Sequence, residues 1–348
     1  MLCALIMAGG KGTRFWPLST EKKPKQFLTL LDKDTMIQMT VKRIEKIIPR
    51  ERIFIVTAKQ YVSLVKEQLS YIPEKNIIVE PIGKNTAPCI ALSAFIIRKY
   101  YEDATIAVLP SDHLIKDVDK FLSILSTAEQ FVNNNKQSVV TLGMKPNRPE
   151  TGYGYIKCIG SGREMNGFNV VKVESFVEKP DLKKAEGYLK SGNYLWNGGM
   201  FIWKADYILE LTKKYIKATY DVLSEIVASK DEDLQSVLDK KYREIESVSV
   251  DYAIMEKVNS AYVIPNDFGW DDIGNWRSVE RYNTKDKEGN VKSINSMTYK
   301  STSNIVLTKK KTLLNNVKNL IIVETEDYLL ISSKDNEQEI KLAKELIS

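Results

Sequence analysis

Short apolar runs alternate with longer amphipathic stretches along the first half of this 348-residue chain. Each run is rich in Val, Ile and Leu, which is typical of a buried strand, and apolar residues recur at helical spacing between the runs. We expect strands at residues 4–7, 52–57, 77–80, 105–109 and 138–143, and helices at residues 36–47, 61–69, 87–101 and 121–133. This alternation indicates a Rossmann-like α/β fold, with a mostly parallel sheet flanked by helices.

The pattern changes from residue 151 onward. The segments TGYGYIKC and NVVKVESFVEKP predict antiparallel strands. They precede a helix at residues 182–190, a strand through WNGGMFIWK and a mostly helical stretch at residues 205–256. After a polar joint the tail contains short apolar runs separated by turn residues, NIVLT, KTLLN, NLIIVET and DYLLIS, and an amphipathic helix is expected at residues 337–347. We therefore expect a catalytic domain over residues 1–283 and a small C-terminal β-rich domain over residues 284–348.

The segment AGGKGTRFWPLSTEKKPKQF follows the first expected strand and combines a glycine-rich turn with fixed positive charge. Gly9, Gly10 and Gly12 allow backbone N–H groups to approach an anion closely, and Arg14 and Lys25 follow in the same segment. The spacing matches neither a Walker A loop nor a dinucleotide-binding fingerprint. A phosphate cradle is the favoured interpretation, while the glycines alone also fit a turn that binds no ligand.

The net charge of +6 is concentrated near the start of the chain, because residues 1–60 hold 12 Lys/Arg and 5 Asp/Glu. Part of this charge fits a solvated helix face around Lys42, Arg43 and Lys46. The rest surrounds the glycine turn, where it would attract a polyphosphate. Nucleic acid is not expected as a partner, since the chain shows no recognised binding module and no aromatic residues interleaved with the basic ones.

The numbers and spacing of cysteine and histidine limit which cellular compartment and which catalytic mechanisms are expected. Three cysteines without CxxC spacing argue against a disulfide framework or a zinc site, so we expect a cytoplasmic protein. The longest apolar stretch, residues 87–97, is too short to span a bilayer, and Met1 leads directly into a strand without room for a signal peptide. We therefore expect no membrane association. The single histidine, His113, excludes mechanisms that need two.

A second candidate loop, LPSDH, ends at His113 and follows the strand expected at residues 105–109. Ligands of parallel sheets bind beyond the carboxyl ends of the strands, and the glycine turn lies at such an end as well. One shared cleft is therefore expected. Asp112 is a candidate ligand of Mg²⁺, which prefers one or two carboxylates with phosphate oxygens and water. Capping of a helix is the alternative role for Asp112.

The motifs AGGKGTRFWPLS, KPKQF, EPIGKNTAP, LPSDH, TGYGYI, VEKP, WNGGMF and FGWDDIGNW occur in this order along nearly the whole chain. In this respect the sequence resembles the mannose-1-phosphate guanylyltransferases, or GDP-mannose pyrophosphorylases. The resemblance implies the nucleotide-diphospho-sugar transferase type of fold with a β-helix-like tail. It also implies Mg²⁺-assisted transfer of GMP from GTP to α-D-mannose 1-phosphate, with release of pyrophosphate by direct displacement. Another hexose or heptose 1-phosphate, or another nucleotide, stays open.

The same resemblance implies roles for individual residues. The catalytic cations would be Arg14 and Lys25; the nucleotide would be bound by Gly9, Gly10, Gly12, Thr13, Asn85 and Thr86; the sugar phosphate by Gly154, Glu178, Lys179 and Asn197; and the metal by Asp112 and Asp272. Asp271 is the alternative to Asp272, and Asn85 or Thr86 could equally cap the following helix. Lys84 stands where the family often has arginine, which makes the choice of base less secure than the fold. Asp251 and Tyr252 belong to a further family signature, DYAIMEK, which the resemblance places at the wall of the sugar pocket without a firm role.

Other functional classes fit the sequence less well. A regulatory protein with a degenerate transferase fold would not need the charged set, which is intact here, and a nicotinamide-dependent oxidoreductase would need a glycine fingerprint that is missing. A fused isomerase domain would need several histidines, and none follows Gly274, so the chain resembles the short, single-activity form. Because exposed strand edges are normally covered, we expect a homodimer.

Overall fold

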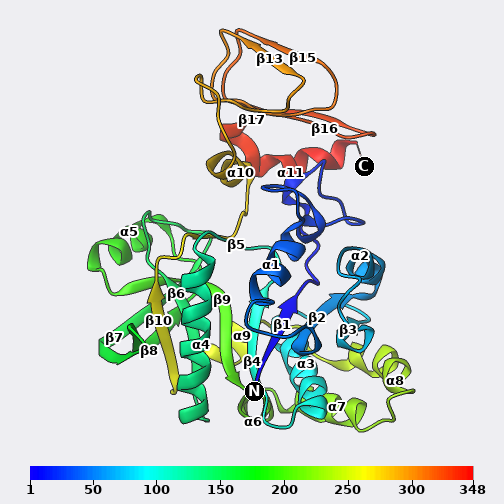
Figure 1. Ribbon diagram of the computed structural model, residues 1–348, viewed down its shortest axis with the longest axis vertical. Coiled ribbons are helices and arrows are strands. Elements are labelled where there is room, and N and C mark those ends of the chain that lie inside the picture. Colours follow the sequence, from blue (N-terminus) through cyan, green and yellow to red (C-terminus); the bar gives the residue numbers. More distant parts are fainter. Residues whose placement is uncertain (348) are drawn as a thin grey trace. The chain divides into compact units, whose positions relative to one another are not determined.

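The computed structural model describes residues 1–347, apart from the side chain of Thr13 (Figure 1). The chain forms two compact units. The first contains Met1–Gly9, Val41–Ser111 and Ile115–Trp270, and the second contains Gly10–Thr40, Asp112–Leu114 and the chain from Asp271 on. The expected domain boundary at residue 283 stays a proposal, since the second unit draws on both ends of the sequence.

A nine-stranded sheet forms the centre of the described part of the first unit. Its strands are β1 (Leu2–Met7), β2 (Ile53–Ala58), β3 (Ile77–Glu80), β4 (Thr105–Pro110), β6 (Val139–Met144), β7 (Gly154–Met165), β8 (Phe168–Val177), β9 (Tyr194–Lys204) and β10 (Ala261–Asn266). Their order is β3-β2-β1-β4-β9-β6-β10-β8-β7. Two-residue strands, β5 (Leu114–Ile115) and β11 (Trp270–Asp271), lie where the chain passes from one unit to the other.

Strands β1 to β4 pair in parallel, and so do β6 and β10. Strand β9 enters between β4 and β6 and runs antiparallel to both. Strands β1, β2 and β4 are buried along almost their whole length, as their continuous apolar runs predict. The expected α/β fold with a mainly parallel sheet is confirmed, and β1 and β4 are direct neighbours, so the loops that leave them start from the same edge.

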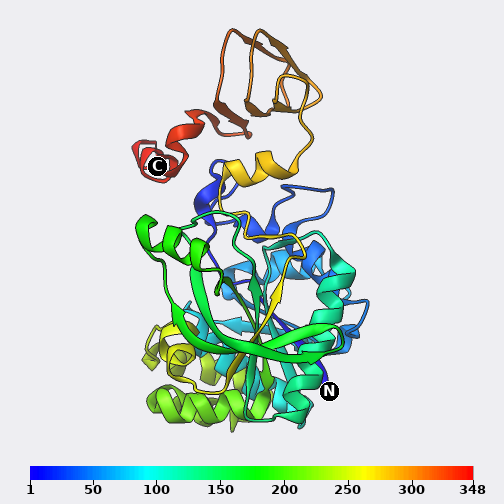
Figure 2. The same cartoon turned by 90° about the vertical axis from the view of Figure 1, so that its left-hand side faces the viewer.

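Helices cover both faces of this sheet, with α4 on one side and α6 and α7 on the other (Figure 2). The helices are α1 (Met36–Ile44), α2 (Val62–Gln68), α3 (Thr86–Tyr100), α4 (Val118–Asn134), α5 (Leu182–Ser191), α6 (Ala205–Tyr215), α7 (Lys217–Val227), α8 (Leu234–Lys241) and α9 (Val250–Ala253). Helix α3 is apolar on most sides and packs into the main core with α6 and α7. Within residues 1–347, no helix is both long and apolar enough to cross a bilayer.

The second unit ends in a small parallel β-coil. It follows α10 (Trp276–Tyr282) and consists of β12 (Val291–Lys292), β13 (Ser296–Tyr299), β14 (Ile305–Leu307), β15 (Thr312–Asn315), β16 (Leu320–Glu324) and the antiparallel β17 (Leu329–Ser333). Ile305 pairs with Ile321 and Ser296 with Thr312, so equivalent positions recur with each winding of the coil. The expected β-rich C-terminal region is confirmed.

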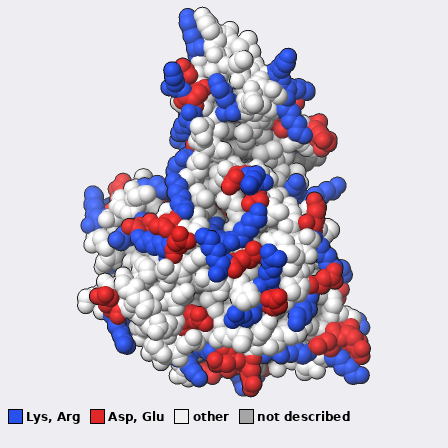
Figure 3. Space-filling model, in the orientation of Figure 1, with Lys and Arg blue, Asp and Glu red and all other residues white. Residues whose placement is uncertain are grey.

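The surface of the coil carries several exposed apolar side chains. These are Met297, Tyr299, Leu313, Leu329 and Ile331. Figure 3 shows a broad uncharged area on the coil, with Lys and Arg mostly at its margins. Exposed apolar patches on a small β-structure mark surfaces that other chains can cover.

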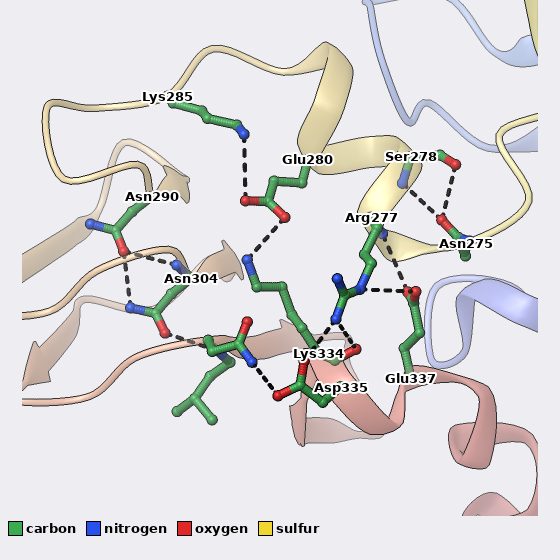
Figure 4. A network of polar contacts seen from close by, with 12 residues as sticks. Asn275, Arg277, Ser278, Glu280, Lys285, Asn290, Asn304, Lys334, Asp335 and Glu337 are labelled. Carbon is green, nitrogen blue, oxygen red and sulfur yellow. Dashed lines mark hydrogen bonds and ion pairs between the residues drawn. The ribbon is translucent and has the colours of Figure 1, made fainter. Parts of the chain in front are cut away.

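Asparagine side chains join successive windings inside the coil (Figure 4). The Nδ2 of Asn304 donates to Oδ1 of Asn290 over 2.9 Å, and the N–H of Leu320 donates to Oδ1 of Asn304 over 2.9 Å. Both asparagines are fully buried. Each buried amide therefore satisfies groups of the neighbouring winding, which fixes the register of the coil.

The helix expected at residues 337–347 is present as a series of helical turns rather than as one regular α-helix. The structure has the 3₁₀ turn η8 (Lys334–Glu339), the single α-turn α11 (Ile340–Ala343) and the 3₁₀ turn η9 (Lys344–Leu346). Ile340 is buried, whereas Leu342, Leu346 and Ile347 are exposed. An apolar stripe with one buried member gives little packing energy, and packing rather than propensity sustains short helices.

Candidate functional site

The glycine turn leaves the buried strand β1 and is held against the following segment. Gly12 has φ +42, and a Cβ at this position would lie 2.8 Å from the backbone nitrogen of Lys25. The Nε2 of Gln26 donates to the carbonyl oxygen of Gly10 over 2.9 Å. Gly12 therefore allows the turn to pack directly on the 3₁₀ turn η2 (Lys25–Phe27), which no residue with a side chain could do without displacement.

Lys25 brings the two candidate metal ligands together. Its side chain is only 8% exposed, and its Nζ lies 2.8 Å from Oδ2 of Asp112 and donates to the backbone oxygen of Asp272. Burial opposes ionisation of Asp112, but the charges of Lys25 and His113 outweigh burial and hold the pKa of this carboxyl below its usual value. The group that we call the lysine cluster, Lys25, Asp112 and Asp272, thus presents an ionised carboxylate beside a buried ammonium.

Asp271 and Asp272 have different surroundings. Asp271 is buried, forms an ion pair with Arg281, and accepts hydrogen bonds from the hydroxyl of Tyr282 over 3.1 Å and the N–H of Ile273 over 2.9 Å. Its carboxylate is therefore used within the fold. Asp272 is only partly buried, and a Cβ at Gly274 would lie 2.7 Å from its Oδ2. This geometry favours Asp272 over Asp271 as a ligand, and the role stays a prediction.

Arg14 lies on the 3₁₀ turn η1 (Thr13–Phe15) and is exposed. Among the described contacts, none joins it to Lys25, Asp112 or Asp272. The structure places Arg14 instead beside residues of the C-terminal turns, around a separate small cavity. The side chain of Thr13, expected at the nucleotide, lies outside what the structure describes.

Most of the residues expected at the sugar phosphate lie together in the first unit. Gly154 on β7 pairs with Asn197 on β9, and a Cβ at Gly154 would lie 3.0 Å from Oε2 of Glu178. The absence of a side chain at Gly154 therefore keeps the space beside Glu178 and Asn197 open. Lys179 has φ +33, is largely exposed and forms an ion pair with Glu178 over 3.1 Å.

Asp251, which had no firm role from the sequence, contacts these residues, and we call Gly154, Glu178, Lys179, Asn197 and Asp251 together the sugar group. Its Oδ1 accepts a hydrogen bond from Nδ2 of Asn197 over 2.9 Å, while Oδ1 of Asn197 accepts from the N–H of Gly199 over 3.0 Å. Burial raises the pKa of Asp251, the hydrogen bond from Asn197 opposes the rise, and the charge of Glu178 adds to it. The only signal in the sequence was the family motif DYAIMEK, because the contact with Asn197 depends on the tertiary fold.

Asn85 and Thr86 both have structural uses. Asn85 has φ 67 and caps α3, with its Oδ1 accepting from the N–H of Thr86 over 2.8 Å. The hydroxyl of Thr86 accepts from the N–H of Val250 over 2.8 Å. The Nζ of Lys84 donates to the carbonyl oxygen of Arg243 over 2.9 Å. The role of this segment at the base stays a prediction.

A buried carboxyl lies near the start of the glycine turn. Glu80, at the end of β3, is 4% exposed, and the hydroxyl of Tyr242 donates to its Oε1 over 2.5 Å. A Cβ at Gly9 would lie 3.5 Å from its Oε2. Burial raises the pKa of Glu80 to about 7, against the opposing hydrogen bonds from Tyr242 and Cys89. Sequence reasoning assigned this residue no individual role.

Comparison with known proteins bears on what these groups do. The model of a family described as nucleotidyl transferase matches residues 3–289. The chain belongs to the nucleotidyl transferase family. The expected enzyme class, a nucleotidyltransferase, is therefore confirmed.

Relatives of this nucleotidyltransferase include proteins named mannose-1-phosphate guanylyltransferase. The chain is 40% identical over 347 residues to a mannose-1-phosphate guanylyltransferase of Salmonella muenchen, covering 98% of this chain and 72% of that protein. It is 37% identical to a mannose-1-phosphate guanylyltransferase of Klebsiella pneumoniae, covering 100% of this chain and 74% of the relative. The chain is thus shorter than these curated relatives.

A solved structure matches the whole chain as well. It comes from Thermus thermophilus and is described as a mannose-1-phosphate geranyltransferase. The two chains superpose with a TM-score of 0.88 at 30% identity, covering 100% of this chain and 99% of the other. The fold of this nucleotidyltransferase, including its C-terminal β-rich region, therefore recurs in full in another protein.

Proposed function

We propose that this chain transfers GMP from GTP to α-D-mannose 1-phosphate and releases GDP-mannose and pyrophosphate. The assignment of the two substrates rests on the 40% identity, over 98% of the chain, to a protein named mannose-1-phosphate guanylyltransferase. The lysine cluster and the sugar group supply the side chains that such a transfer needs. Apart from Asp251, the residues of both groups were expected from the sequence motifs, and each group is assembled from distant segments.

The reaction is a direct displacement at phosphorus. An oxygen of the sugar phosphate forms a bond to the α-phosphorus of GTP while the bond to pyrophosphate breaks, and no covalent enzyme intermediate is needed. Phosphoryl-type transfer depends on positioning and charge neutralisation more than on covalent help. The ammonium of Lys25 neutralises charge on the phosphate, and Asp112 holds this ammonium in place over 2.8 Å.

The lysine cluster also fits a divalent metal ion. The carboxylate of Asp112 is held ionised beside Nζ of Lys25, and the same Nζ donates to the backbone oxygen of Asp272, so the two aspartates lie in one neighbourhood. Mg²⁺ typically takes one or two carboxylates together with phosphate oxygens and water, rather than a full set of protein ligands. Asp112 and Asp272 would hold the ion, which would stabilise charge on the phosphates.

The sugar group accounts for recognition of the second reactant. Glu178 and Asp251 offer carboxylate oxygens, Asn197 offers an amide, and the missing side chain at Gly154 leaves space beside them. Carboxylates and amides fix the positions of several hydroxyl groups at once, which is how one hexose is distinguished from its epimers. Lys179 is exposed and suits a phosphate rather than a hydroxyl.

A matrix of four nucleoside triphosphates against several sugar 1-phosphates tests this function, with pyrophosphate release as the readout. We expect release with GTP and mannose 1-phosphate at least about tenfold faster than with any other pair, which corresponds to about 1.4 kcal/mol of discrimination. Faster release with another hexose or heptose 1-phosphate, or with another nucleotide, would contradict the assigned substrates. No release with any pair would contradict the reaction itself.

We further propose that two copies of the chain associate through the β-coil. The exposed apolar side chains of the coil, including Leu313, Leu329 and Ile331, favour a partner that covers them. Light scattering at micromolar concentration should give twice the mass of one chain, and Leu313→Lys should shift it toward the mass of one. A wild-type mass of one chain would contradict the homodimer. The cytoplasmic location expected from the cysteines stays a prediction.

A further inference from the structure

A small cavity in the second unit lies between η1, the start of α10 and the C-terminal turns. Its volume is about 70 Å³, enough for a few water molecules. The polar side chains around it come from three segments: Arg14 from η1, Asn275 from the start of α10, and Glu337, Gln338 and Lys341 from η8 and α11. Residues more than 300 positions apart therefore line one space.

Apolar packing below the cavity fixes these segments to one another. Phe15, which directly follows Arg14, is fully buried, and its ring meets the ring of Trp276 edge-on with centroids 5.1 Å apart. Ile340, which directly precedes Lys341, belongs to the same core. Arg14 and Lys341 thus each adjoin a residue anchored in one hydrophobic cluster, so their positions are coupled.

The carboxylate at the cavity already has a cationic partner. Glu337 is 7% exposed; its Oε2 accepts from the backbone N–H of Arg277 over 3.2 Å, and its Oε1 lies 3.6 Å from Nε of Arg277 (Figure 4). Arg277 also pairs with Asp335, and it donates to the backbone oxygen of Lys334, which belongs to a second group of ion pairs, Lys285 and Lys334 with Glu280. The six charges of the two groups sum to zero.

Arg14 and Lys341 stand outside both groups. Neither has an ion-pair partner within the part of the chain that the structure describes. Two unpaired cations beside a carboxylate that is already paired leave positive charge at the cavity mouth, and a guanidinium with an ammonium suits an anion with several oxygens. The arrangement is that of an anion site completed by the C-terminal turns.

We propose that Lys341 binds the terminal phosphates of the nucleotide, and the pyrophosphate that leaves, together with Arg14. This inference rests on the proposed function. The C-terminal region then takes part in phosphate binding, because Lys341, the second cation, lies in the segment after β17. Lys341 contacts no reacting bond, so its contribution is to binding rather than to the chemical step.

The test compares Lys341→Gln with Lys344→Gln. Lys344 lies one turn further on and lines a different cavity, beside Trp16. We expect Lys341→Gln to raise the KM for GTP, and the KM for inorganic pyrophosphate in the reverse reaction, about five- to tenfold. The KM for mannose 1-phosphate and kcat should change less than about twofold. Lys341→Arg should restore the values, and Lys344→Gln should match the wild type.

A double variant distinguishes binding of a shared ligand from a structural role of Lys341. If Arg14 and Lys341 bind the same phosphates, the effects of Arg14→Gln and Lys341→Gln on the KM for pyrophosphate should combine non-additively. Equal pyrophosphate KM values for Lys341→Gln and Lys344→Gln would overturn the inference, as would a purely kcat effect. If the wild type shows no activity with any reactant pair, the proposed function fails, and calorimetry with inorganic pyrophosphate then tests Lys341 independently.

Discussion

Replacing Glu80 by glutamine isolates the consequence of burying an acid at the end of β3. Glutamine has nearly the same shape, and its amide oxygen can still accept the hydrogen bond that Tyr242 donates over 2.5 Å. The substitution removes the ability of Glu80 to ionise, and it replaces one of the two oxygens that accept from Tyr242 and Cys89 by an amide nitrogen. Cys89 and Tyr242, which face Glu80, both have pKa values raised by burial, so neither ionises near neutral pH.

The magnitude follows from the pKa. Burial raises the pKa of Glu80 from 4.5 to about 7. Between these values the folded protein keeps a proton that the unfolded chain has released, so the free energy of unfolding falls as pH rises through this window. The slope is about 1.4 kcal/mol per pH unit, which gives a loss of about 3 kcal/mol between pH 4.5 and pH 8.

Urea unfolding of the wild type and Glu80→Gln at pH 4.5, 6, 7 and 8 measures this loss. We expect the variant to gain stability relative to the wild type by about 3 kcal/mol over the range, with most of the gain below pH 7. Glu67→Gln, at an exposed position on α2, is the control and should run parallel to the wild type. A constant difference between Glu80→Gln and the wild type would refute the reasoning.

Three further predictions concern the candidate sites. Asp272→Ala should remove at least about 99% of turnover, without rescue by added Mg²⁺ and without a change in the free energy of unfolding. Asp271→Asn should instead cost about 2 kcal/mol of stability and leave kcat of the folded enzyme intact. Measuring both the unfolding curve and the turnover of each variant separates the two roles. Gly12→Ala should lower kcat by at least about tenfold, because its Cβ meets the backbone of Lys25 at 2.8 Å, and normal turnover would exclude this packing role. Asp251→Asn should raise the KM for mannose 1-phosphate about tenfold with the KM for GTP unchanged, and steady-state kinetics showing the reverse would place Asp251 elsewhere.

The pattern of apolar residues along the sequence predicted those strands and helices that are buried along their whole length. Strands β1, β2 and β4 follow from continuous apolar runs, and α3 follows from a long apolar helix pattern. The insertion of β9 between β4 and β6 could not be predicted, because strand order depends on pairing between distant segments. The short strands β12 and β13 were missed, since their residues are largely polar or exposed.

The lysine cluster was partly predictable for a topological reason. The carboxyl ends of parallel strands meet at one edge of a sheet, and β1 and β4 are neighbours, so Lys25 and Asp112 were expected together. The contact of Asp251 with Asn197 and the location of Arg14 beside Lys341 were not predictable. Both depend on segments far apart in sequence that only the folded chain joins.

The central claim is that the sugar phosphate displaces pyrophosphate directly, within a site that neutralises charge and forms no covalent intermediate. The most direct test uses GTP made chiral at the α-phosphorus with sulfur and an oxygen isotope, followed by phosphorus NMR of the nucleotide sugar. A single in-line displacement predicts inversion of configuration at phosphorus. Net retention would show two successive displacements through an enzyme-bound nucleotide and would contradict the account.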